Sequence, residues 1–111
     1  MIGFYEIINS TDIIETTLTK TNKIDSFTDE KRQEQVKLLT EKDIVSLEED
    51  YESDCLIVKS DTGYELGELS AAVSKKVMEK VDDIYDVPAY VSELDYDINT
   101  EKTKVKIKIV L

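Results

Sequence analysis

Polar and apolar residues alternate toward the C-terminal end of the chain, and this pattern predicts a β-hairpin over residues 87–111. Its strands are expected at Val87–Ile98 and Thr103–Leu111, joined by a turn at Asn99–Thr100. Antiparallel pairing across this turn opposes three acids to three lysines, namely Asp97 to Lys102, Asp95 to Lys104 and Glu93 to Lys106. Each opposed pair contributes only about 0.2–1 kcal/mol, but all three agree on one register. The hairpin is therefore expected to have a charged outer face and an apolar core face.

The stretch from Glu41 to Asp82 predicts, in order, a strand, an acidic turn, a strand, a glycine turn, a short strand and a helix. The apolar run at positions 55–58 is typical of a strand that is covered on both faces. Gly63 suits a turn with positive φ, and Gly67 suits a bulge or the close approach of another backbone. Ser70 is a good helix cap. The apolar residues that follow it at helical spacing form one stripe: Val73, Val77, Val81 and Ile84.

The N-terminal part of the chain predicts two strands and a short helix. Ile2–Ile8 and Ile13–Lys20 are rich in β-branched and aromatic residues and are expected to be strands, although the first could equally be an ordered arm. Thr28 is a helix cap, and the helix is expected over Asp29–Leu39 on the surface of the protein. Its buried residues should be Val36 and Leu39, with help from Leu38.

Length and composition predict a single domain over residues 1–111. The sequence contains no linker, repeat or low-complexity tract, and 41% hydrophobic residues suffice for a core without disulfides. A single cysteine, Cys55, fits a reducing compartment. The sequence shows neither a secretory leader nor the apolar run of about 18 residues that a membrane span needs. These features predict a cytoplasmic protein with no membrane segment.

The acidic balance of the chain limits its possible partners. The formal net charge is −11, from 25 acidic and 14 basic residues. Such a surface repels phosphate backbones at long range, and tight sequence-independent nucleic-acid binding usually rests on several Lys or Arg contacts. The lysines at positions 102, 104, 106 and 108 are natural candidates for such contacts. The opposed acids favour another interpretation, a solvated charge ladder that protects an edge strand.

The sequence offers little material for catalysis, so we expect a non-enzyme with no metal and no cofactor. It contains no histidine, and one cysteine cannot build a zinc site. An acidic cluster lies between two predicted strands: Glu48, Glu49, Asp50, Glu52 and Asp54. The cluster lacks the central glycine and the spacing of a calcium loop, which favours a solvated turn. Tyr51, inside this turn, is expected either to pack over the sheet edge or to face a ligand.

Several segments of the central stretch match one known family in order and spacing. They are Lys31-Arg32-Gln33-Glu34, the strand Glu41–Glu48, the signature-like run Tyr51–Val58, the turn Asp61-Thr62-Gly63, and Leu66–Ser70 leading into the helix from Ala71. In this arrangement the chain resembles a HIRAN domain, a small β-rich module found fused to SNF2-type helicases and nucleases and also alone in bacteria and phages. The resemblance covers about residues 24–85. The family's Asn-Pro is Glu49-Asp50 here, and its aspartate is Glu52.

The resemblance implies an α+β, mainly β fold: a small SH3-like or OB-like β-barrel with two short helices. It also implies recognition of single-stranded DNA at its 3′ end. Tyr51 would then stack on or contact the terminal nucleotide, and Glu52 would accept a hydrogen bond from a sugar hydroxyl. Asp54 belongs to the same signature, and Lys20 and Lys23 are the candidates for the basic residues expected near the end of the first strand.

Two functions remain open from the sequence. The first is a stand-alone HIRAN-like module that binds single-stranded DNA ends as an accessory to a DNA-processing machine. The second is an acidic protein-interaction module that keeps the fold and has lost DNA binding, with a partner from a DNA repair or phage pathway. Metal binding by the acidic cluster alone is a weaker third interpretation.

Overall fold

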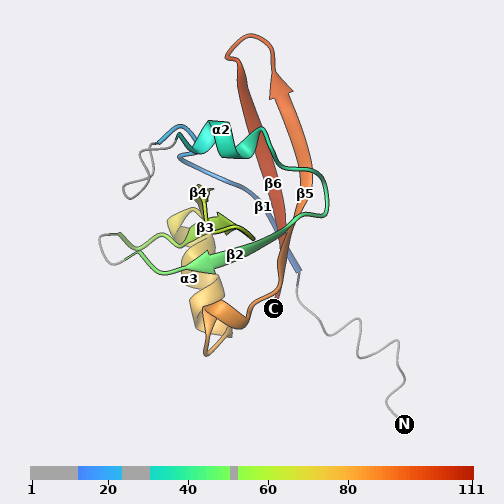
Figure 1. Ribbon diagram of the computed structural model, residues 1–111. Helices are drawn as coiled ribbons and strands as arrows, with labels where there is room; N and C mark the ends of the chain where they lie inside the picture. The colour runs from blue at the N-terminus through green and yellow to red at the C-terminus, as the bar shows by residue number, and fades with distance from the viewer. Residues whose placement is uncertain (1–12, 24–30, 51–52) are drawn as a thin grey trace.

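A computed structural model describes residues 13–23, 31–50 and 53–111, and the described strands form one curled antiparallel sheet (Figure 1). The strands are β1 Ile13–Thr17, β2 Ile44–Glu48, β3 Ile57–Ser60, β4 Glu65–Glu68, β5 Ala89–Asp97 and β6 Lys102–Val110, in the sheet order β1-β6-β5-β2-β3-β4. The helices are α2 Arg32–Val36, α3 Ala71–Lys80 and the 3₁₀ turn η1 Ile84–Asp86. This half-barrel confirms the predicted α+β, mainly β fold with two short helices.

The curled sheet is closed at one point, where its two ends meet. Directly after β1, the backbone N–H of Thr19 donates to the carbonyl of Glu68 at 2.8 Å, and the N–H of Glu68 donates back to Thr19 at 2.9 Å. Gly67 makes the approach possible, because an added Cβ would lie 2.9 Å from the Thr19 carbonyl oxygen. The predicted role of Gly67 is confirmed. The predicted strand Ile13–Lys20 ends earlier, at Thr17, and continues only as this single bridge.

The C-terminal hairpin has the predicted register. Asp97 pairs with Lys102, Asp95 with Lys104 and Glu93 with Lys106. The connecting turn is longer than expected, since Ile98 to Glu101 all lie outside the strands, and Glu101 takes a φ of 56°. A bulge at Ser92 then shifts the pairing, so that Val91 opposes Ile107. The far end of this hairpin extends beyond the rest of the fold (Figure 1).

Helix α2 differs from its prediction in extent and in the face that it buries. It spans only Arg32–Val36, while Thr28 and the start of the predicted helix lie outside the described residues, as does Ile2–Ile8. Val36 is fully buried as expected, Leu39 is half-buried, and Leu38 is 74% exposed, so its predicted share in the core was wrong. The helix packs against β4 and β6, and this contact buries Arg32 together with Val36.

Helix α3 begins where the sequence predicts, and a hydrogen bond joins it to the start of β3. The side chain of Ser70 accepts a hydrogen bond from the N–H of Val73 at 3.3 Å, which confirms the cap. Val77 is buried, but the helix ends at Lys80, so Ile84 reaches the core from η1. One turn into α3, the buried hydroxyl of Ser74 accepts from the N–H of Leu56 at 2.9 Å and holds the start of β3. Gly63 has the predicted positive φ, at 93°.

Candidate functional site

The residues predicted to bind a DNA end have different surroundings in the structure. Lys20 and Lys23 follow β1 and reach the carboxylate of Glu68 on β4. Asp54 lies in the loop before β3 and lines a hollow beside α3. Among the described residues, Asp54 forms no ion pair with either lysine. Tyr51 and Glu52 lie outside the described residues, so the roles expected of them stay predictions.

A buried ion cluster lies where the two ends of the sheet meet. Arg32 donates from its two terminal guanidinium nitrogens to Glu68, at 2.9 Å, and to Glu65. All three side chains are almost completely buried. Lys20 and Lys23 reach the oxygens of Glu68 at 3.6 and 3.7 Å, with 46% and 53% of their side chains exposed. We refer to these five residues as the seam cluster.

Backbone contacts place Arg32 in the seam cluster. Its guanidinium also donates to the carbonyl of Lys20 at 3.0 Å, and its backbone N–H donates to the carbonyl of Lys23 at 2.9 Å. Arg32 and Val36 are four residues apart in α2 and therefore share one helix face. Since Val36 is held in the core, Arg32 is turned inward with it. The turn of Lys20–Lys23 is thus fixed to the start of the helix.

The seam cluster stabilises the fold where the two ends of the sheet meet. Desolvation lowers the pKa of Arg32, but the hydrogen bonds to Glu68 and Glu65 outweigh this effect, so the pKa of Arg32 lies above its usual value. The guanidinium therefore stays charged. Removing it would leave buried Glu65 without its cation and buried Glu68 with only the two half-exposed lysines, at a typical cost of about 3–5 kcal/mol. Solvent reaches the cluster chiefly at the half-exposed ammonium groups of Lys20 and Lys23.

Two adjoining hollows lie beside α3, and both are lined by Glu49 and Met78. The first has a volume of about 200 Å³ and is lined by Glu49, Asp50, Ser53, Asp54, Cys55, Leu56 and Met78. The second has a volume of about 150 Å³ and is lined by Glu49, Met78, Val81, Asp82, Asp83, Ile84 and Tyr85. We call the two together the Met78 groove.

The Met78 groove combines acidic and apolar groups. Its described lining includes five carboxylates and no basic residue: Glu49, Asp50, Asp54, Asp82 and Asp83. Met78 is 41% exposed, and a methionine side chain adapts readily to irregular partners. Each hollow is smaller than the roughly 300–1,000 Å³ of typical small-molecule pockets. Each hollow therefore has a size that suits individual side chains of a larger partner.

Hydrogen bonds within the acidic loop fix one wall of the groove. The hydroxyl of Ser53 donates to the carboxylate of Asp50 at 3.0 Å, and it accepts from the N–H of Cys55 at 3.2 Å. Cys55 is half-buried in this wall and precedes β3, so it lies just outside the strand in which it was expected. Ser53 and Asp54 are exposed, as expected for a solvated turn, and these local hydrogen bonds order its described residues.

Two further observations concern metals and membranes. Within residues 13–23, 31–50 and 53–111, no group of three or more His, Cys, Asp or Glu side chains is arranged to hold a metal ion. This finding includes Glu48, Glu49, Asp50 and Asp54 but not Glu52. In the same described part of the chain, no helix has the length and apolar character needed to cross a membrane.

Sequence reasoning missed the residues that hold the seam together. No role was predicted for Glu65 or Glu68, and Arg32 was named only within the family resemblance, yet all three are buried. A signal was present for Arg32, which is placed four residues before the core residue Val36. No comparable signal marks the two glutamates, because their burial depends on the closing of the sheet.

Comparison with known proteins adds no relative to this description. A scan against protein-family models, a search of curated proteins and a search of solved structures each found no significant match.

Proposed function

We propose that this chain is a non-enzymatic, HIRAN-like interaction module whose Met78 groove binds a basic segment of a protein partner. The observation that carries this proposal is the lining of the groove, with five carboxylates, an exposed methionine and no basic residue among its described members. Lysine and arginine side chains would meet the carboxylates, and an apolar side chain would contact Met78 and the 60% exposed Tyr85. Such complementarity mainly favours encounter and specificity.

The charge distribution supports a protein partner over a nucleic acid at this groove. Asp54, one of the residues expected to contact a DNA end, lies among other carboxylates, which repel phosphate. The two lysines expected to assist it share Glu68 in the seam cluster. The carboxylates of the Met78 groove would therefore attract a basic peptide segment and repel a DNA backbone.

A calorimetric titration of the full chain with a short amphipathic lysine–leucine peptide tests the proposal. We expect binding that weakens as salt is added, with no heat from a glutamate–leucine peptide of equal length. The variant Glu49→Gln/Asp82→Asn should weaken binding, whereas Glu34→Gln/Glu41→Gln removes the same charge from exposed residues outside the groove and should not. Equal losses in both double variants would reduce the effect to net charge and overturn the proposal.

A second candidate function, binding of single-stranded DNA 3′ ends, is favoured by one observation. The ammonium groups of Lys20 and Lys23 each reach one oxygen of the Glu68 carboxylate, and about half of each side chain is exposed, so a phosphate that approaches from solvent would meet two positive charges. Their ion pairs with Glu68 are partly solvated, and contacts of this kind are weak enough to exchange. In this proposal Tyr51 would stack on the terminal base for about 1–3 kcal/mol, and Glu52 would accept from the terminal hydroxyl.

Fluorescence anisotropy with single-stranded DNA separates the second candidate from the first. At low salt, an oligonucleotide with a 3′-hydroxyl should bind more tightly than one with a 3′-phosphate, and Tyr51→Ala should remove this preference. Lys20→Gln/Lys23→Gln should weaken binding, with Lys75→Gln/Lys76→Gln on the exposed face of α3 as the matched control. No binding at low salt, where electrostatic attraction is strongest, would exclude the DNA function and leave the Met78 groove unaffected.

A further inference from the structure

Strand β5 has one partner along its whole length and another along only part of it. It pairs with β6 from Ala89 to Asp97, but β2 pairs with it only at Ala89 and Tyr90. Two hydrogen bonds with the loop before β2 add one more position, since the carbonyl of Val91 accepts from the N–H of Lys42 at 2.7 Å and its N–H donates to the carbonyl of Asp43 at 2.8 Å. From Ser92 to Asp97, no described residue pairs with the other edge of the strand.

The bulge explains why the pairing with β2 stops there. Ser92 is the extra residue between the pairs Val91–Ile107 and Glu93–Lys106. A bulge bends and twists its strand, so the part of β5 beyond Ser92 turns away from the line of β2. The same bulge leaves the hydroxyl of Ser92 shielded from solvent with no hydrogen-bond partner among the described residues.

The opposite edge of the hairpin is protected in a way that β5 is not. On β6, the carbonyl of Val105 accepts from the N–H of Leu18 at 2.8 Å. Two residues further, the side-chain amide of Gln33 accepts from the N–H of Thr103 at 3.0 Å and donates to its carbonyl at 3.2 Å. This amide takes the place of a paired strand. One edge of the extending hairpin is therefore covered, while the edge of β5 beyond Val91 is left open by residues 13–23, 31–50 and 53–111.

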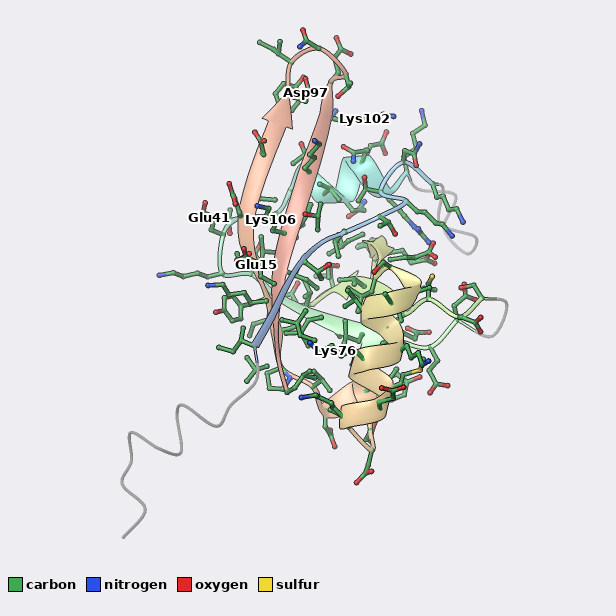
Figure 2. All side chains as sticks on the ribbon, turned by 180° about the vertical axis from the view of Figure 1, so that it is seen from behind. Glu15, Glu41, Lys76, Asp97, Lys102 and Lys106 are labelled. Carbon is green, nitrogen blue, oxygen red and sulfur yellow. The ribbon has the colours of Figure 1, made fainter. Side chains whose placement is uncertain are left out.

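The charges along the open edge are incompletely neutralised. Glu93 forms an ion pair with Lys106 at 3.4 Å. Asp95 and Asp97 oppose lysines in the register, yet neither forms an ion pair within 4.0 Å with a described residue. Asp97 and Lys102 lie at the far end of the hairpin, where Asp97 is partly exposed and Lys102 is exposed (Figure 2). Alternate positions of β5 thus present three carboxylates on one face.

We propose that the open edge of β5 binds an extended basic segment of a partner protein by strand addition. The backbone of Ser92–Asp97 would supply the hydrogen bonds, which is the usual source of affinity in this mode of recognition. Lysine or arginine residues at alternate positions of the segment would lie beside the three carboxylates and continue the charge ladder of β6. This site differs from the Met78 groove and does not depend on it.

A second copy of the chain fits this edge poorly. Antiparallel pairing of β5 with β5 about Asp95 would place Asp95 against Asp95 and Glu93 against Asp97. Like charges directly opposite each other are destabilising. A basic strand has the complementary pattern, and an apolar side chain on its other face would cover part of Tyr96, which is 55% exposed.

The test uses the full ¹⁵N-labelled chain and a short peptide that alternates lysine and valine. We expect amide shifts confined to Ser92–Asp97 and slower hydrogen exchange there, and no effect from a glutamate–valine peptide. The lysine–valine peptide with N-methyl groups at alternate residues keeps its charge but cannot pair as a strand on one edge. Loss of binding with the methyl groups on one of the two edges supports strand addition, and equal binding of all forms overturns it.

Two matched charge variants separate this site from the Met78 groove. Asp95→Asn/Asp97→Asn should weaken binding of the lysine–valine peptide about 2- to 30-fold, as expected for the loss of two cross-strand charge pairs. Glu49→Gln/Asp82→Asn removes equal charge from the groove and should leave this binding unchanged. The reverse result would place the peptide in the groove and overturn the proposal. Concentration-dependent self-association through the same amides would also overturn it, by making a second copy the occupant.

Discussion

Arg32 occupies a position of α2 that faces the interior, and its charge is matched there by Glu65 and Glu68. A methionine of similar volume would fill this space but would leave both carboxylates buried without the guanidinium. Arg32→Met should therefore lower the free energy of unfolding by about 3–5 kcal/mol, measured by urea denaturation. Lys75→Met, which removes a 4.0 Å contact with Glu79 on the surface, should change it by about 0–1 kcal/mol. Similar losses in both variants would contradict the role of the seam cluster.

The carboxylate of Asp43 is expected to make a pH-dependent contribution to the stability of the fold. This carboxylate accepts from the backbone N–H and the hydroxyl of Thr40, each at 2.8 Å. These hydrogen bonds, that from the backbone first, hold the pKa of Asp43 below its usual value of 3.8. Because the folded state favours the ionised form, the contribution to stability is present above pH 3.8 and is lost as the pH falls through the lower pKa of the folded state.

An NMR titration of the Asp43 carboxyl carbon and the Thr40 amide checks this prediction. Both signals should share a midpoint below 3.8. Asp43→Asn keeps an acceptor for the Thr40 N–H, so the turn should persist while the pH dependence of that amide disappears. A midpoint at or above 3.8 would show that the hydrogen bonds do not form in solution.

At the scale of elements, local patterns predicted what depends on local chemistry. The cap at Ser70, the positive φ of Gly63 and the hairpin register follow from neighbouring residues, and the structure has them all. The bulge at Ser92 was not predicted, because it depends on how β5 pairs with its neighbouring strands rather than on its own pattern. The short extent of α2 was not predicted either, because the residues that the helix buries depend on its packing against β4 and β6 and not on its own sequence pattern alone.

Gly67→Ala tests the closure of the sheet. The new methyl group would lie 2.9 Å from the Thr19 carbonyl oxygen and 3.1 Å from the Cβ of Leu18, so the two strand ends must separate. We expect the free energy of unfolding to fall by about 1–3 kcal/mol, and hydrogen exchange at the amides of Thr19 and Glu68 to become faster. Gly63→Ala is the control: its positive φ makes alanine strained, but no atom lies within 4 Å of the new methyl group. It should destabilise the protein without selectively speeding exchange at the seam.

Gln33→Ala tests the cover over β6. The substitution removes two bonds to the Thr103 backbone and one to the Thr21 hydroxyl, at 2.8 Å. We expect the free energy of unfolding to fall by about 1–2 kcal/mol, given the usual net contribution of partly buried hydrogen bonds. Hydrogen exchange of the Thr103 amide should become markedly faster. Gln33→Glu keeps the acceptor for that amide, so its stability and its Thr103 exchange rate should lie between those of the wild-type protein and Gln33→Ala. Unchanged exchange in Gln33→Ala would mean that the amide is protected by something other than Gln33.

At the scale of the whole molecule, fold and site differ in how far the sequence reaches. Local patterns predicted most of the strands and helices, and the mainly β, barrel-like fold was predicted through the family resemblance. The candidate site depended instead on which distant segments meet: Met78 and Asp82 come from the second half of the chain and face Glu49 across the groove. Lys20 and Lys23 were named only through the family resemblance, and their contact with Glu68 could not be predicted because it depends on the closing of the sheet.

The net charge of −11 gives the last prediction, because attraction and repulsion respond to salt in opposite directions. Raising NaCl from about 10 mM to about 150 mM shortens the Debye length from about 30 Å to about 8 Å. This weakens exposed ion pairs such as Lys106–Glu93, which are worth at most about 1 kcal/mol each. It also screens the mutual repulsion of the acidic excess, while the buried pairs of Arg32 are screened much less. With 25 acids against 14 bases, the relief of repulsion should dominate, and the urea midpoint should rise with salt. Glu34→Gln/Glu41→Gln reduces the excess without touching a described ion pair and should show a smaller rise, whereas a fall in the midpoint would mean that the surface ion pairs dominate.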